Sequence, residues 1–342
     1  MPRFKTRDYL GRWITIRDRP GVVESAVISL IAMALAFFLW WVLTAGPVDQ
    51  RIIDPITLPS VGETFRSFPQ LWFDRALARS AVWSLSRVFG GFMLAGVIAI
   101  PAGILAGVFL RLNSFMKPFT IFGRNIPVAA LIPLTLMWFG LGETQKVMFI
   151  FLASVAFVFF DSANAVGKVP DSYLDAAYTL GATFVPRHGL KWALIMGVGY
   201  AVAFAFAFLM LNARPVAQDV ALRAAWTWHF VDLTGIGFLI GLLLWFPIMS
   251  YQAVRKVLLP LAMPDIVNSL RLLFGLAFGY IMLAEVINAE LGLGAIINIS
   301  QRQGPREHIY LSLLLIALLA FLIDRFILGL QRRLFPYRQP GE

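Results

Sequence analysis

The sequence contains no cysteine and few charged residues. The lack of cysteine excludes disulfides, thiolate catalysis and cysteine-based metal sites. The three histidines, His188, His229 and His308, lie far apart in the chain and show no metal-ligand spacing. Charged residues make up only 14% of the chain, whereas an average soluble protein has about 25%. No grouping of nucleophile, acid and base is present either, so the sequence does not predict an enzyme.

Long apolar runs dominate what is present. Hydrophobic residues make up 59% of the 342 positions, and the mean hydropathy is +0.76. Runs of roughly 18–25 apolar residues can cross the hydrocarbon core of a bilayer as helices, which satisfy their own backbone hydrogen bonds. We therefore predict an all-α polytopic membrane protein with eight spans, at about 24–44, 84–110, 116–141, 145–166, 192–212, 233–250, 266–287 and 309–330. Pro127 and Pro133 predict a kink or break in the third span.

The net charge of +10 follows from membrane topology. Lysines and arginines cluster at the ends of the apolar runs, which is typical of cytoplasmic loops and does not indicate a nucleic-acid partner. The basic segment 1–23 is expected in the cytoplasm, and eight spans would place the C-terminus there as well. The same bias predicts that residues 167–191 and 251–264 share the cytoplasmic face.

A polar stretch at residues 169–181 interrupts the apolar pattern. Pro170 suits the first position of a helix, and Gly181 is a natural helix stop. Four residues of such a helix share one face at i, i+3, i+4 and i+7 spacing: Tyr173, Ala176, Ala177 and Leu180. This pattern predicts a short amphipathic helix suited to docking against a partner, and an ordinary interfacial helix explains it equally well.

The same stretch resembles the coupling signature of ABC-importer permeases. That signature reads here as Asp175-Ala176-Ala177 and Gly181, and it continues as Val257, Leu259 and Pro260 if residues 184–249 are removed. Four further segments resemble permeases of the nitrate/sulfonate/taurine (NitT/TauT) type: Ser84 to Phe92, Arg124-Asn125-Ile126-Pro127, Trp138 to Gly142, and Ala284-Glu285 with Gly292-Leu293-Gly294. The resemblance covers nearly all of residues 25–183 and 250–335.

The resemblance implies a type I ABC importer permease core of six helices with an inserted transmembrane hairpin. The expected parts are a cytoplasmic N-terminus (1–23), a first core part (24–183), the inserted hairpin (184–249), a second core part (250–335) and a cytoplasmic tail (336–342). It also implies a bacterial cytoplasmic-membrane location. The expected partners are a second permease copy, an extracytoplasmic solute-binding protein and cytoplasmic ATPase subunits.

The expected contact with the ATPase is the coupling loop. Its expected contact residues are Asp175, Ala176, Ala177, Gly181, Val257, Leu259 and Pro260. The chain has no phosphate-binding Gly-x-x-x-x-Gly-Lys-Ser/Thr loop, so ATP and Mg²⁺ are expected on the ATPase, with no cofactor on this chain. Two departures from the family pattern are Asp175, where the family has glutamate, and the insertion itself.

Charged residues inside spans are costly and often functional. Arg124, Pro127 and Glu285 are candidates for the translocation pathway, and structural contacts are the alternative for both charged residues. Asp324 and Arg325 are expected to pair with each other near the end of the last span.

The predicted function is the membrane subunit of an ATP-driven importer of a small solute. Nitrate, sulfonates, taurine and bicarbonate are among the cargoes of similar permeases, and the sequence does not select one. The alternative is an ion-coupled secondary transporter or channel that uses Arg124, Asp161 and Glu285 as ion-linked groups. That alternative requires no ATPase and leaves the coupling pattern unexplained.

Overall fold

The computed structural model describes residues 20–211, 220–288 and 290–337. Across these ranges the chain is helical, apart from turns and one isolated antiparallel bridge, so the all-α prediction is confirmed. The first helices are α2 (Val22–Leu43), α3 (Val61–Arg66), α4 (Phe68–Phe73), α5 (Leu77–Val108), α6 (Leu110–Asn125), α7 (Leu131–Phe139) and α8 (Glu143–Gly167). The remaining ones are α9 (Asp171–Thr179), α10 (Pro186–Leu211), α11 (Val220–Ser250), the π-helix η3 (Val254–Leu258), α12 (Leu259–Asn288), α13 (Leu293–Gln303) and α14 (Arg306–Leu334).

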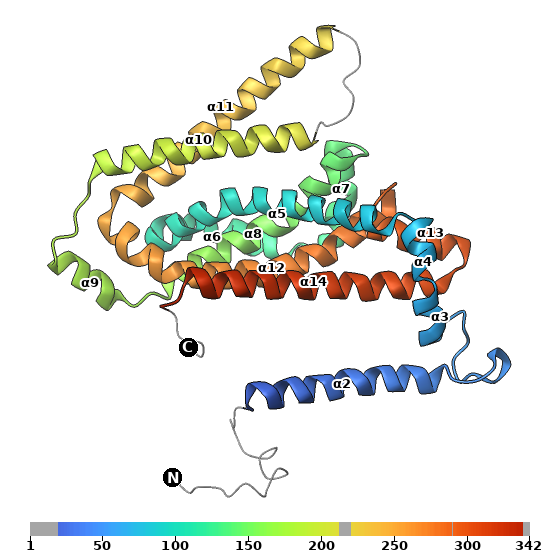
Figure 1. Ribbon diagram of the computed structural model, residues 1–342. Helices are drawn as coiled ribbons and strands as arrows, with labels where there is room; N and C mark the ends of the chain where they lie inside the picture. The colour runs from blue at the N-terminus through green and yellow to red at the C-terminus, as the bar shows by residue number, and fades with distance from the viewer. Residues whose placement is uncertain (1–19, 212–219, 289, 338–342) are drawn as a thin grey trace, which may run out of the picture.

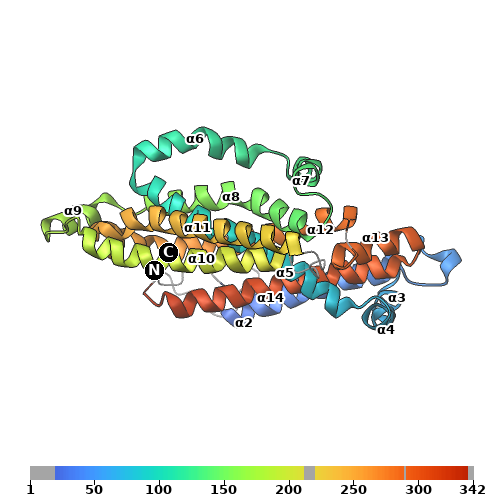
Figure 2. The ribbon, with the colours of Figure 1, turned by 90° about the horizontal axis from the view of Figure 1, so that it is seen from above.

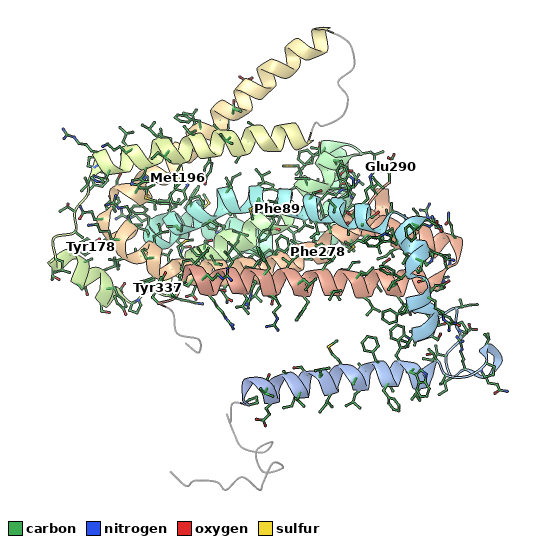
Figure 3. The ribbon with its side chains drawn as sticks, in the orientation of Figure 1. Phe89, Tyr178, Met196, Phe278, Glu290 and Tyr337 are labelled. Carbon is green, nitrogen blue, oxygen red and sulfur yellow. The ribbon has the colours of Figure 1, made fainter. Side chains whose placement is uncertain are left out.

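The long helices lie side by side as an elongated bundle (Figures 1 and 2). The short helix α9 lies at one end, and α13 lies at the other. We call these the α9 end and the α13 end. Tyr178 and Tyr337 mark the α9 end in Figure 3, and Glu290 marks the α13 end.

Six helices in the described part of the chain are long and apolar enough to span a membrane. The pair Leu110–Asn125 and Val128–Phe139 counts as a seventh if it is one span bent by 88°. The predicted span at 233–250 corresponds to Thr234–Ser250, an apolar stretch shorter than the others. Between this span and the one predicted at 192–212, the chain is helical from Val220 onward, and residues 212–219 lie outside the described residues.

The break in the third span falls at Pro127, as predicted. Ile126 adopts extended angles (φ −65°, ψ 127°), because the proline ring disfavours a helical conformation in the residue before it. Pro133 lies in the first turn of α7, where a missing N–H leaves no helical bond unmade. Pro101 and Pro247 lie within continuous helices.

Helices α5 and α8 form the centre of the bundle. Small residues recur at every fourth position along α5, at Gly91, Ala95, Ala99, Gly103 and Gly107. A Cβ atom on Gly91 would lie 2.5 Å from the carbonyl oxygen of Val147, and one on Gly103 would lie 2.5 Å from that of Phe159. Small residues therefore allow the two backbones to approach closely, which is the usual way to pack helices in lipid.

Helices α10 and α11 form a hairpin with its own close contact. A Cβ on Gly241 would lie 2.8 Å from the Cα of Gly197. The hairpin is attached to α5 through Tyr200, whose hydroxyl donates to the carbonyl oxygen of Val97. Trp245 Nε1 donates to the Tyr200 hydroxyl at 3.2 Å, so both arms of the hairpin take part in this attachment.

Helix α2 stands apart from the bundle along most of its length (Figure 1). None of its most apolar 18-residue window is buried. Its contacts are at its C-terminal end, where Trp40 Nε1 donates to the carbonyl oxygen of Pro59 at 2.9 Å and the Trp40 ring lies 6.3 Å from that of Tyr310. The apolar sides of α2 are thus open to lipid.

Candidate functional site

Helix α9 has well-defined ends. It begins at Asp171, and Pro170 is its N-cap rather than its first helical residue. At its C-terminal end, Gly181 has a left-handed φ of +80°. The Ala182 N–H donates to the Ala177 carbonyl at 2.9 Å, and the Gly181 N–H donates to that of Tyr178 at 3.0 Å. This pair of bonds is a Schellman motif, which confirms the predicted helix stop at Gly181.

The predicted docking face of α9 is only partly available to a partner. Ala177 is 8% exposed, on the side of α9 that meets η3. Leu174 packs beside Val254 and Leu258 in the same cluster. In contrast, Tyr173 is 51% exposed and Leu180 is 88% exposed. The open part of the face therefore consists of Tyr173, Ala176 and Leu180.

The two halves of the motif meet in space although the α10–α11 hairpin separates them in sequence. The Val185 N–H donates to the carbonyl oxygen of Ser250 at 2.8 Å. The Gln252 N–H donates to the carbonyl oxygen of Thr183 at 3.2 Å. Between these bonds Phe184 and Tyr251 form the antiparallel bridge, with ring centroids 4.9 Å apart. The chain thus leaves for the hairpin and returns from it at one point.

The second half of the motif continues from this bridge. The π-helix Val254–Leu258 leads into α12, and π-helical turns occur often at functional sites. Val257 and Leu259 are half-buried, whereas Pro260 is exposed. The Tyr337 hydroxyl donates to the Pro260 carbonyl at 2.6 Å, so the chain after α14 contacts this segment. All seven motif residues lie at the α9 end.

Glu285 lies at the α13 end, in a network of buried ionic contacts. Its side chain is fully buried, and its Oε1 accepts from Arg87 Nη1 at 2.7 Å. The Ser84 hydroxyl donates to the same carboxylate at 2.8 Å. Arg87 also pairs with Glu143, to which Lys146 Nζ donates at 2.9 Å. The network joins α5, α8 and α12.

The same carboxylate holds the turn before α13. The Gly294 N–H donates to Glu285 Oε2 at 2.9 Å, and a Cβ on Gly292 would lie 2.5 Å from Glu285 Cδ. These contacts use both oxygens of Glu285. Arg87 and Glu285 both lie in segments that resemble the family, but their pairing was not predicted. The signal that could have predicted this pair was the opposite charge of two residues that both lie in predicted spans.

Arg124 and Pro127 lie elsewhere, at the break between α6 and α7. The guanidinium carbon of Arg124 lies 3.7 Å from the ring centroid of Phe160, a cation–π contact. Its Nε is buried without a hydrogen-bond partner. Pro127 is exposed. The structure therefore does not bring these two pathway candidates together with Glu285.

An ion pair between two partly exposed side chains links α12 with α14. Arg271 Nε lies 3.2 Å from Asp324 Oδ1. Arg325, which was expected to pair with Asp324, instead lies over the Phe321 ring, with 4.9 Å between its guanidinium carbon and the ring centroid. That prediction was wrong because it relied on closeness in the sequence, and neighbouring residues on a helix point in different directions.

The fold resembles that of a solved importer. The chain matches the inward-facing MetNI methionine ABC transporter with a TM-score of 0.52 and 20% identity, over 78% of this chain and 97% of the other. This likeness supports the type I importer permease fold.

Relatives in sequence cover most of this chain. The taurine transport system permease protein TauC of Escherichia coli K12 is 25% identical over 319 residues, which is 92% of this chain and 90% of TauC. The putative aliphatic sulfonates permease SsuC of Bacillus subtilis 168 is 20% identical, over 96% and 94% of the two chains. The bicarbonate permease CmpB of Synechococcus elongatus is 24% identical, over 88% and 87%.

A family model described as "Binding-protein-dependent transport system inner membrane component" matches residues 99–251 and 248–336. The two matches together cover more than half of the chain and divide beside the bridge where the two halves of the motif meet. The named relatives are permeases of the NitT/TauT type, as the sequence motifs predicted. The chain therefore belongs to the family of binding-protein-dependent transport system inner membrane components.

Proposed function

We propose that this chain is the permease subunit of an ATP-driven importer and that α9 with η3 transmits the movement of a separate ATPase. The observation that carries the proposal is the backbone bridge at Phe184 and Tyr251. Because of this bridge, the two halves of the coupling motif form one surface despite the intervening hairpin. Leu174 packs α9 against the cluster that contains Val254 and Leu258 of η3, and Tyr173 and Leu180 are exposed for the ATPase.

The proposal includes an orientation. The α9 end would face the cytoplasm, since α14 ends toward it in Figure 1 and basic residues lie at the start of α10, on η3 and in the last turn of α14. The α13 end would then face the solute-binding protein. A second copy of the chain would complete the pathway.

The three pathway candidates separate into two groups under this proposal. Arg124 and Pro127 remain candidates for the pathway, because they lie at the sharp bend between α6 and α7. Glu285 acts as a structural anchor for α13, since Arg87, Ser84 and Gly294 use both of its oxygens. The different partners of Arg124 and Glu285 also weaken the alternative of a shared ion-coupled site.

The proposed cargo is a small anion. The relatives are named for taurine, aliphatic sulfonates and bicarbonate, which share an anionic group. Uptake of these three solutes into proteoliposomes that contain the complete importer tests the proposal. ATP-dependent uptake of bicarbonate or of an aliphatic sulfonate would support an anion importer, whereas uptake of taurine alone, which is a zwitterion, would support recognition of an anionic group only. Uptake of none, with ATP-dependent uptake of an uncharged or cationic solute, would reject the anion.

The coupling assignment is tested by a charge placed on the open face of α9. Leu180→Asp should abolish co-purification of an ATPase with a phosphate-binding loop, because an apolar contact is replaced by a carboxylate. Tyr178→Asp is the matched control, since Tyr178 is 59% exposed on the same helix and lies off the predicted face. Ala177 is a poorer probe, because it is buried against the chain itself.

The two variants separate coupling from stability. The proposal expects normal membrane levels for both variants and loss of the ATPase from Leu180→Asp alone. Retention of the ATPase and of ATP-driven uptake in Leu180→Asp would show that α9 is not the coupling helix.

A further inference from the structure

A cavity without an assigned role lies at the base of the α10–α11 hairpin. Its volume is about 300 Å³, and it is lined by Trp192, Met196, Met249 and Arg255. Its walls are almost entirely apolar. Trp192 and Met196 are one turn apart on α10, where Figure 3 shows Met196. Met249 lies in the last turn of α11, and Arg255 belongs to η3.

The cavity lies at the level where two candidate spans begin. One span is Pro186–Ala205, and the other is Val254–Ile287. Trp192 follows the start of the first by less than two turns, and Arg255 is the second residue of the other. We take this level as the boundary between lipid headgroups and hydrocarbon, where tryptophan is enriched and arginine flanks the spans on the cytoplasmic side.

The surroundings of the cavity are basic and lack acidic partners. Four cations lie on the first turns of these two spans: Arg187, Lys191, Arg255 and Lys256. In the described ranges none of the four forms an ion pair. The charge of Arg255 therefore requires an anion or water from outside the chain.

We propose that this cavity binds one anionic phospholipid. An acyl chain would lie against Trp192 and Met196, and the phosphate would pair with Arg255. A cation at the rim of an apolar cavity matches a lipid that has a charged headgroup and an apolar tail, whereas a free phosphate would leave the apolar walls unused. Because its walls come from both arms of the hairpin and from η3, the bound lipid would tie the hairpin to the coupling segment.

Native mass spectrometry of the delipidated full-length chain in detergent tests this site. The chain is titrated separately with phosphatidylglycerol and with phosphatidylcholine. We expect one tightly bound phosphatidylglycerol, roughly fivefold weaker binding in Arg255→Gln, and near-normal binding in Arg255→Lys. Lys256→Gln is the matched control, because it removes the neighbouring charge, which is exposed and does not line the cavity.

Two further measurements distinguish a lipid from other anions. Glycerol phosphate, which has the headgroup charge without the tail, should not displace phosphatidylglycerol. Met196→Trp should weaken lipid binding with all charges retained, because the larger side chain fills the cavity, and its elution as a single species shows that it has folded. Equal weakening by Lys256→Gln and Arg255→Gln, equal affinity for phosphatidylcholine, or displacement by glycerol phosphate would each overturn the proposal. The readout is binding alone, so the result is independent of transport.

Discussion

At the scale of single residues, Glu285 carries the densest set of buried polar contacts described. Its carboxylate joins Arg87 and Ser84 of α5 to the turn before α13. Removing one member of a buried ion pair leaves the other charge without compensation, which destabilises a protein strongly. Here Glu143 would still pair with Arg87, which limits the loss.

Glu285→Gln should lower the free energy of unfolding by about 3 kcal/mol, the lower end for a broken buried pair. Denaturant unfolding of the chain in detergent micelles measures the change. Glu290→Gln is the control, since Glu290 is exposed and lies only a few residues further along the chain. An equal effect of the two substitutions would mean that the network does not stabilise the fold.

Gly292 supports the same contact through its lack of a side chain. It has a φ of +135°, and a Cβ would lie 2.5 Å from Glu285 Cδ. Gly304 also has a positive φ, of +103°, with open space around it. Gly304→Ala should cost about 1–3 kcal/mol from backbone strain alone. Gly292→Ala should destabilise the fold clearly more in the same unfolding assay, and an equal loss would argue against the close approach.

Sequence reasoning at this scale succeeded where the cause is local. The glycine stop at Gly181 and the break at Pro127 follow from the backbone preferences of single residues. The partners of Arg87 and Asp324 could not be read in that way, because each pairs with a residue on a distant helix. Which charges meet depends on helix packing, which the local pattern does not determine.

At the scale of elements, the backbone enters and leaves the α10–α11 hairpin at one bridge. The Val185 N–H to Ser250 carbonyl bond is one of the two bonds that the residues flanking a two-residue hairpin turn exchange. The close contacts at glycines show that the two arms of the hairpin pack mainly on each other. The hairpin is also attached to α5 through Tyr200. The sequence predicted a hairpin of two runs, but it did not predict that α11 extends back to Val220, because Arg223, His229 and Asp232 interrupt that stretch.

Replacing residues 186–249 by Asn-Gly should therefore preserve the coupling surface. These two residues favour the turn that the bridge requires. We expect the shortened chain to insert in the membrane and to co-purify with the ATPase, as measured by affinity purification. A version that joins Val185 directly to Ser250 is the control, because it cannot form the turn. Loss of the ATPase from the Asn-Gly version, despite membrane insertion, would show that the hairpin belongs to the coupling machinery.

At the scale of the whole molecule, the account rests on the direction in which the bundle crosses the membrane. The chain has no cysteine, so single cysteines can be labelled without background. Ser172 on α9 and Gln301 on α13 are both exposed and lie at opposite ends. In intact cells an impermeant maleimide should label Gln301→Cys, and Ser172→Cys should react only after the membrane is opened. The reverse pattern would invert the proposed orientation.

The central claim is that ATP hydrolysis by a partner drives transport through the surface made by α9 and η3. The most direct measurement is solute uptake by proteoliposomes that contain the permease, its ATPase and its binding protein, with the wild type compared with Leu180→Asp and Tyr178→Asp. The account predicts ATP-dependent uptake by the wild type and Tyr178→Asp, and none by Leu180→Asp. Uptake that continues without ATP, or that is unchanged in Leu180→Asp, would contradict it.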